Sequence, residues 1–221
     1  MKRIVFFSLT VFLLLSSCVT STQTRQSMYP KMYEEKPTTI LIMPPINNTN
    51  HAEAKEYFYT SMAKPLCEKG YYVVSPSMAI DILKQESAYD SENFINGSLK
   101  PFRNVFGADA VMFTTINKWE KQSALSYITV GIEYTLKSTK TGEILFHRSG
   151  ELNVNLSSGS TSLLGMALDV LKTATTDKIV AARRCNEYVL FDLPRGVYHP
   201  NFDKDQNVNA GSAELKGRIK N

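Results

Sequence analysis

The sequence predicts an α/β or α+β fold with a single mixed five-stranded sheet flanked by helices. Short apolar, β-branched runs alternate with helical patterns in the first half of residues 28–200. Residues 126–156 alternate between apolar and polar side chains, as the strands of an antiparallel hairpin do. An apolar helical pattern then runs from Leu163 to about Tyr188. Strands joined through helices imply parallel crossovers and the hairpin adds antiparallel pairs, so the sheet should be mixed.

The elements of the first half follow from local signals. Apolar runs bounded by Pro, Gly or polar residues indicate three strands, at 38–43, 71–74 and 110–116. Between them, cap residues and terminators indicate helices at about 50–70, from Ser75-Pro76 onward and at about 98–107. In the first of these helices an apolar residue recurs at every fourth position, which is the pattern of a helix with one buried face.

The hairpin predicted at 126–156 has one polar face. Its first strand directs Thr129, Glu133, Thr135 and Lys137 to one side and an apolar row to the other. If a strand of the hairpin lies at the edge of the sheet, its unpaired backbone groups form a template for another chain. We therefore expect partner binding or self-association along an edge formed by these four residues.

The N-terminus has the features of a lipoprotein signal peptide. Residues 1–17 join a positive tip to an apolar run that is too short for a permanent membrane span. The run ends in Leu-Ser-Ser-Cys18, which resembles the bacterial lipobox. We expect cleavage before Cys18, a diacylglycerol on its thiol and an acyl chain on its new amino group. Two or three acyl chains give stable membrane anchoring.

The segments at the two ends of the chain contain few apolar residues. Residue 19 is Val rather than Asp, which in the enteric sorting rule indicates the outer membrane, with the domain facing the periplasm. Thr20–Ser27 has no apolar residue, so 18–27 is expected to be a flexible lipidated tether. Residues 201–221 are mostly polar and are expected to be a disordered tail. The globular domain would then span 28–200.

Charge and motif content exclude several classes of function. The formal net charge is +4 and falls to +2 once residues 1–17 are removed, which is too small to indicate nucleic-acid binding. His51, His147 and His199 stand in no metal-binding spacing, and the sequence has no nucleophile elbow or phosphate loop. We expect no enzyme activity, no metal and no cofactor apart from the covalent lipid on Cys18.

Two groups of side chains have both a structural and a functional interpretation. Cys67 and Cys185 each lie near the end of a predicted helix, where they could pair in an oxidising periplasm or be buried as apolar residues. Trp119, Tyr127 and Tyr134 could line an aromatic binding surface, although packing against the sheet is the commoner role. The sequence leaves both questions open.

Several longer motifs resemble a family of bacterial lipoproteins of unknown function. Between about Met28 and Pro200 these motifs are K-P-T-T-I-L-I-M-P-P-I-N-N-T-N, A-K-E-Y-F-Y-T, E-K-G-Y-Y-V, E-S-A-Y-D, G-S-L-K-P-F-R-N-V-F-G-A-D and G-V-Y-H-P. The resemblance implies a fold similar to the amino-terminal domain of TolB, in which a segment like Gly107–Val111 precedes a strand. It also implies a role in envelope assembly or export beside a curli-channel-like lipoprotein, and it defines no catalytic residue.

The leading hypothesis is therefore a non-enzymatic accessory lipoprotein or scaffold of the outer membrane that binds another envelope protein. The alternatives are an enzyme acting on cell-wall material and a carrier of a small apolar ligand. A deep apolar pocket with a few convergent polar groups would favour the alternatives. An exposed patch or a free sheet edge would favour the first hypothesis.

Overall fold

The structure is a computed structural model that describes residues 23–122, 127–155 and 174–219, without the side chains of 122 and 174–177. The predicted signal peptide, Cys18 and the first part of the helix predicted from Leu163 lie outside the described residues. No helix among the described residues is long and apolar enough to cross a membrane.

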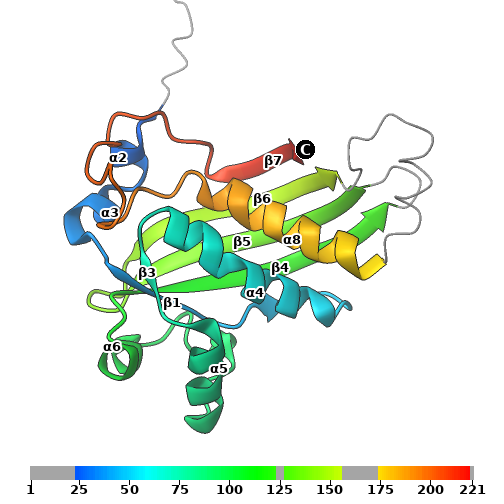
Figure 1. Ribbon diagram of the computed structural model, residues 1–221, viewed down its shortest axis with the longest axis horizontal. Coiled ribbons are helices and arrows are strands. Elements are labelled where there is room, and N and C mark those ends of the chain that lie inside the picture. The colour runs from blue at the N-terminus through cyan, green and yellow to red at the C-terminus, as the bar shows by residue number, and fades with distance from the viewer. Residues whose placement is uncertain (1–22, 123–126, 156–173, 220–221) are drawn as a thin grey trace, which may run out of the picture.

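A mixed seven-stranded sheet forms the centre of the domain, with helices on both faces (Figure 1). The strands are β1 (Thr39–Ile42), β2 (Ile46–Asn47), β3 (Tyr72–Val73), β4 (Ala110–Gln122), β5 (Tyr127–Ser138), β6 (Ile144–Asn155) and β7 (Glu214–Ile219). The helices are α2 (Arg25–Met28), α3 (Pro30–Glu35), α4 (Glu53–Glu68), α5 (Pro76–Gln85), the 3-10 helix η1 (Ser91–Asn93), α6 (Lys100–Phe106) and α8 (Ala174–Leu190).

The strand order is β3-β1-β4-β5-β6-β7, and β2 pairs with β4 off this path. The strands β3, β1 and β4 are mutually parallel, whereas β4, β5 and β6 form an antiparallel meander. The last strand, β7, runs parallel to β6. The predicted fold class is confirmed, but the prediction of five strands is wrong. The sequence signal missed β2, which has only two residues, and β7, whose only buried side chains are Leu215 and Ile219.

Residues 201–219 are a packed part of the domain, so the predicted disordered tail is wrong for this range. Asp205 is fully buried, and β7 pairs with β6 from Ser149 to Val154. The approach of β7 depends on Gly150, which has a φ of 146°. A Cβ atom at Gly150 would lie 2.1 Å from the carbonyl oxygen of Leu215, so a side chain there would displace β7. The polar composition of this segment predicted disorder wrongly, because backbone pairing with β6, rather than burial of apolar side chains, largely holds β7 in place.

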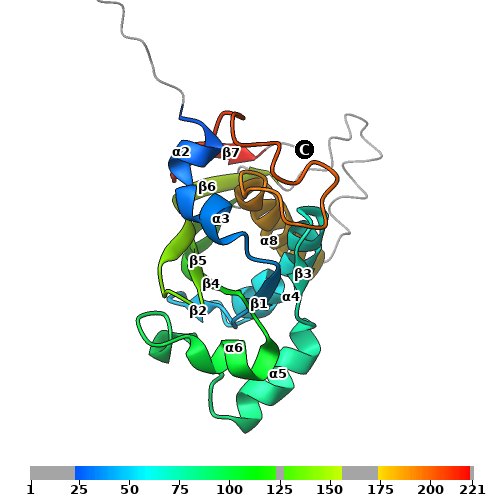
Figure 2. The same ribbon diagram turned by 90° about the vertical axis from the view of Figure 1, so that its left-hand side faces the viewer.

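The sheet separates two hydrophobic cores. Alternate residues along β1 and the residue after it point to opposite sides, so Ile40 and Ile42 face α4 and α8 while Leu41 and Met43 face α5 and α6. Figures 1 and 2 both place α5 and α6 at one end of the domain and α2 and β7 at the other. One end of the domain is therefore formed by α5 and α6, and the opposite end includes α2 and β7.

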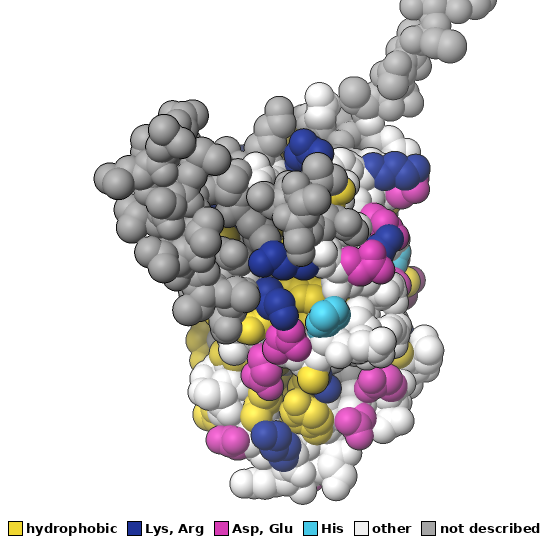
Figure 3. All heavy atoms as spheres, turned by 90° about the vertical axis from the view of Figure 1, so that its right-hand side faces the viewer, with side chains coloured by type: hydrophobic (Ala, Val, Ile, Leu, Met, Phe, Trp, Pro, Cys, Tyr) yellow, Lys and Arg dark blue, Asp and Glu magenta, His cyan; other side chains and the backbone are white. Residues whose placement is uncertain are grey.

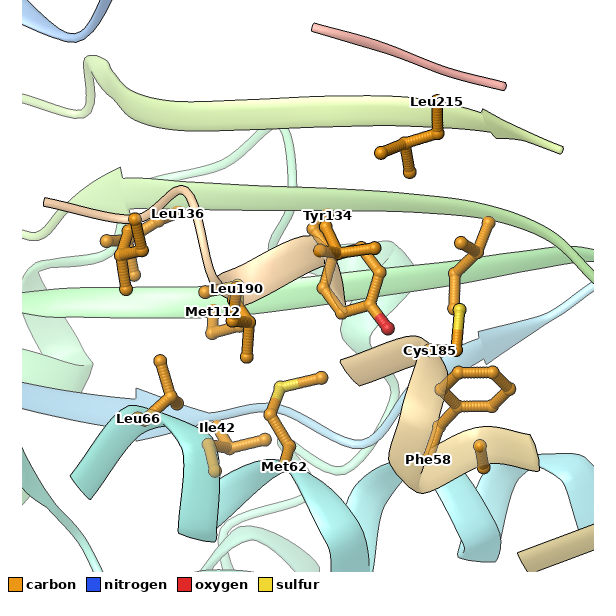
Figure 4. Packing of buried hydrophobic residues seen from close by; sticks show 14 of the residues in the cluster. Ile42, Phe58, Met62, Leu66, Met112, Tyr134, Leu136, Cys185, Leu190 and Leu215 are labelled. Atoms are coloured by element: carbon orange, nitrogen blue, oxygen red, sulfur yellow. The ribbon is translucent and has the colours of Figure 1, made fainter. Parts of the chain in front are cut away.

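The larger core lies between the sheet and the pair α4 and α8. Figure 4 shows side chains of both helices pointing at the sheet, among them Phe58, Met62, Leu66, Cys185 and Leu190. The buried amide of Asn186 links the layers, because it accepts a 2.5 Å hydrogen bond from the hydroxyl of Tyr134 and donates to the carbonyl of Phe58 at 3.0 Å. Trp119 is also buried here and packs edge-to-face on Phe58 with ring centroids 5.5 Å apart. Packing is thus the role of Trp119 and Tyr134, whereas Tyr127 is half-buried.

The two cysteines after Cys18 are both free thiols. Cys67 is exposed at the end of α4, and Cys185 is fully buried in α8. Of the two roles that the sequence left open, the pairing of Cys67 with Cys185 is not formed, and Cys185 is a buried apolar residue. Burial raises the pKa of the Cys185 thiol to about 12, so this thiol stays protonated at neutral pH.

We expect one of these two thiols to react in the native protein. At neutral pH a maleimide should label Cys67 within minutes, whereas Cys185 should react only after denaturation, because it is buried and protonated. Mass spectrometry of labelled peptides gives the site, and a Cys67→Ser variant should lose the fast reaction. If unfolded, unreduced protein had no reactive thiol at either position, the two cysteines would be paired after all.

The strand β5 lies in the interior of the sheet, between β4 and β6. Thr129, Glu133, Thr135 and Lys137 all have partners on both neighbouring strands, so the predicted partner-binding edge at these residues is wrong. Alternation along one strand shows which face is polar but contains no information on which strands lie beside it. Among the described strands, the outer positions belong to β3 and β7.

Candidate functional sites at the two ends of the domain

Arg25 fixes the N-terminal segment to the domain. Its Nη1 lies 2.9 Å from Oδ2 of Asp205, its Nε lies 3.5 Å from Oδ1 of Asp192, and its Nη2 donates to the carbonyl of Phe191 at 3.1 Å. The side chains of Arg25, Asp192 and Asp205 are only 4%, 6% and 0% exposed. The prediction of a flexible tether through residue 27 is therefore wrong for its last residues, because they belong to the fold.

The two carboxylates at Arg25 have further hydrogen-bond donors. The hydroxyl of Tyr29 donates to Asp192 at 2.7 Å, and the hydroxyl of Tyr33 donates to Asp205 at 3.1 Å. Burial, with a smaller effect of the neighbouring carboxylate, raises the pKa of both tyrosines, so both hydroxyls remain donors. Two backbone N–H groups of the C-terminal segment also donate to these carboxylates, those of Arg195 and Gly211.

The first described residues run beside the C-terminal segment. The N–H of Ala210 donates to the carbonyl of Gln23 at 2.8 Å, Thr24 forms an antiparallel bridge with Asn209, and the N–H of Arg25 donates to the carbonyl of residue 208 at 2.8 Å. The described part of the domain begins at Gln23, five residues after Cys18. Sequence reasoning missed this docking because a lone arginine in a polar segment usually faces solvent, and its carboxylate partners are more than 160 residues away.

A groove of about 860 Å³ opens beside this N-terminal segment, and we call it the arginine groove. It lies among the C-terminal half of α8, residues 208–211 and the end of β7. Four arginines line it, two of them buried (Arg25 and Arg148) and two partly exposed (Arg184 and Arg195). Three apolar side chains on its lining are exposed, namely Phe191 (70%), Tyr188 (42%) and Val208 (43%).

A small apolar hollow of about 170 Å³ lies at the opposite end of the domain, between α5 and α6. We call it the α5–α6 hollow, and its lining includes Ile82, Leu83, Phe94, Phe102, Val105 and Phe106. Phe94 and Phe102 pack edge-to-face with ring centroids 5.0 Å apart. Two exposed apolar positions lie on the helices that form the hollow, Met78 on α5 and Val105 on α6. Such a hollow is large enough for one apolar side chain and too small for a lipid tail.

Another side of the domain has a surface of mixed character where it is visible. In Figure 3 charged side chains of both signs interrupt small hydrophobic patches.

His147 is surrounded by polar side chains on the sheet. No cluster of His, Cys, Asp and Glu among the described residues could hold a metal ion. On the polar face of the sheet, Nδ1 of His147 lies 3.1 Å from the hydroxyl of Thr135 and 3.8 Å from Oε1 of Glu133. In a catalytic triad, one ring nitrogen of the histidine binds the nucleophile and the other binds the orienting acid. Here both partners meet the same nitrogen, so this trio is a polar surface cluster.

Comparison with known proteins places the chain in a family. Residues 28–188 match the family model described as "Putative lipoprotein GNA1162-like". The chain belongs to this family. The expectation of a lipoprotein agrees with membership of this family, whose members have no established function. A curated relative, "Putative lipoprotein NMB1124/NMB1162" of Neisseria meningitidis serogroup B, is 26% identical over 139 residues. That match covers 62% of this chain and 65% of the relative, slightly less than two thirds of its length.

Several solved structures are similar to parts of this chain. Lipoprotein GNA1162 from Neisseria meningitidis has 24% identity and a TM-score of 0.49, covering 61% of this chain and 94% of that one. A PelC dodecamer from Paraburkholderia phytofirmans has 12% identity and a TM-score of 0.41, with 70% and 90% covered. The C-terminal domain of LpoB from Escherichia coli has 20% identity and a TM-score of 0.35, with 57% and 96% covered. At these sequence identities and TM-scores, the solved structures assign no function to this chain.

Proposed function

We propose that the protein is a lipid-anchored, non-enzymatic accessory protein of the outer membrane, facing the periplasm, that binds another envelope protein through its α5–α6 end. The observation that carries this proposal is the position of the α5–α6 hollow at the end of the domain opposite Gln23 (Figures 1 and 2). Anchored at one end, the domain presents its apolar hollow at the other.

The short connection to Cys18 supports this orientation. Five residues span at most about 18 Å when fully extended, so acyl chains on Cys18 hold Gln23 close to the membrane surface. Arg25 ties this segment to the body of the domain through Asp192 and Asp205, and the end with α2 is therefore proximal to the membrane. The α5–α6 hollow is then distal, where a neighbouring envelope protein can reach it.

The chemistry of the α5–α6 hollow suits a protein partner. A pocket that takes one apolar side chain, with the exposed Val105 on its lining and the exposed Met78 on α5, is typical of the centre of a protein interface. Its small volume does not suit the alternative of a carrier for an apolar ligand. The geometry at His147 gives no support to a hydrolytic enzyme. The family resemblance makes a curli-channel-like lipoprotein the first partner to test.

We expect Val105→Asp to weaken partner binding about 30-fold or more, because it places an unpaired charge in the α5–α6 hollow. A photo-crosslinking amino acid at the exposed residue Met78 should give an adduct with one envelope protein in cells, and Val105→Asp should remove it. Asn104→Asp is the matched control, since it adds the same charge at an exposed neighbour that does not line the hollow. Circular dichroism must show that both variants are folded. An adduct of unchanged yield in Val105→Asp would contradict the proposed surface.

A further inference from the structure

The arginine groove lies at the end of the domain that the anchor would hold against the membrane. We propose that this groove binds the phosphate of a phospholipid headgroup in the membrane that holds Cys18. This inference rests on the proposed lipid anchor, which places the arginine groove near the membrane. Partner binding at the α5–α6 hollow does not require it.

The position of Gln23, close in sequence to Cys18, places the groove next to lipid. Ala210 lines the groove and donates a hydrogen bond to the carbonyl of Gln23, the first described residue. Only four residues separate Gln23 from Cys18. The extended length of this connection, about 18 Å, is comparable to the depth of a headgroup layer together with the adjoining water. A domain on such a short connection cannot turn this groove far from the membrane.

The charges in the groove suit an anionic phosphate. The charge of Arg25 is paired with Asp192 and Asp205, and the buried Arg148 donates to two carbonyls, those of Val189 and Ser212. Arg184 and Arg195 are partly exposed on the same lining. Glu187 is the carboxylate on the lining besides Asp192, so positive charge is in excess there. A guanidinium binds phosphate through two parallel hydrogen bonds and loses less hydration than an ammonium does.

The exposed apolar side chains of the groove favour a lipid over a free phosphate ion. Phe191, Tyr188 and Val208 leave apolar surface in water beside the arginines. Aromatic residues with arginines beside them are typical of the membrane interface, where rings meet the acyl boundary and cations meet phosphates. A phospholipid satisfies both sets of side chains, whereas inorganic phosphate would use only the arginines.

A flotation experiment tests this site without the covalent lipid. The processed chain, residues 18–221, carrying Cys18→Ser should float with vesicles of phosphatidylglycerol and phosphatidylethanolamine, and far less with vesicles of phosphatidylcholine alone. Each arginine near an anionic surface contributes roughly a factor of five to partitioning, so Arg184→Gln combined with Arg195→Gln should lower binding about 30-fold. Phe191→Ser, which keeps all charges, should lower binding severalfold.

The matched control removes the same charge elsewhere. Lys100→Gln combined with Lys121→Gln alters two exposed lysines outside the groove and should leave flotation unchanged. An equal loss in this control, or no flotation of the Cys18→Ser chain at all, would overturn the proposal. So would full release by inorganic phosphate at an ionic strength where sodium chloride releases little. Acyl labelling of the wild-type chain is scored separately, so failure of the anchor and failure of the groove are distinguishable.

Discussion

Arg25→Ala should lower the free energy of unfolding by about 3–5 kcal/mol, because it leaves buried carboxylates without their cation. Asp205 is fully buried and Asp192 nearly so, and the tyrosine hydroxyls that bind them cannot neutralise a charge. The carbonyl of Phe191 also loses a donor. Urea denaturation followed by circular dichroism measures the loss. In the folded fraction, proteolysis should cut the N-terminal segment faster than in the wild type.

Two companion variants show whether burial of charge is the cause. Lys36→Ala removes an exposed ion pair to Asp203 that joins the same two segments, and it should cost only about 0–1 kcal/mol. Adding Asp205→Asn to Arg25→Ala should recover part of the stability, since one uncompensated charge disappears. If Arg25→Ala were no more costly than Lys36→Ala, the N-terminal segment would not be held by Arg25, and the membrane-proximal position of the arginine groove would lose its support.

Cys18→Ser should abolish lipid attachment completely. The thioether forms on a thiol, and a serine hydroxyl does not provide the thiolate nucleophile. We expect no incorporation of labelled palmitate, and the chain should accumulate as an unprocessed precursor or in the soluble fraction. Cys67→Ser is the control, because no lipobox precedes Cys67, and its labelling should equal that of the wild type. Acyl labelling that survives Cys18→Ser would contradict the lipobox prediction.

The elements with strong local patterns could be predicted from the sequence. The segment predicted as a strand at 38–43 forms β1 at Thr39–Ile42, and the alternating segment at 126–156 forms β5 and β6. Gly107 ends α6 in a left-handed conformation, as a helix terminator does. The helix predicted at about 50–70 begins slightly later, since α4 starts at Glu53 with Ala52 in the cap position. Periodicity and caps act within a few residues, so a single sequence contains enough information to locate these elements.

The candidate sites depended on contacts that no local pattern encodes. The arginine groove exists because Arg25 meets Asp192 and Asp205, and the α5–α6 hollow exists because two helices pack on one face of β1 and β4. The interior position of β5 could not be predicted either. The hairpin pattern indicates its pairing with β6, but its pairing with β4 on the other side depends on the tertiary fold.

The sequence by itself determined the fold class, the predicted lipobox at Cys18, the membership of a lipoprotein family and the polar face of the hairpin. Only the tertiary structure decided that the polar C-terminal segment joins the sheet through β7, that Arg25 is buried, and which strands are outermost. The sequence did not predict these features because the composition of a segment indicates only how much apolar surface that segment can bury. Backbone pairing with β6 and a buried ion pair with Arg25 instead hold a polar segment in place through partners distant in the chain.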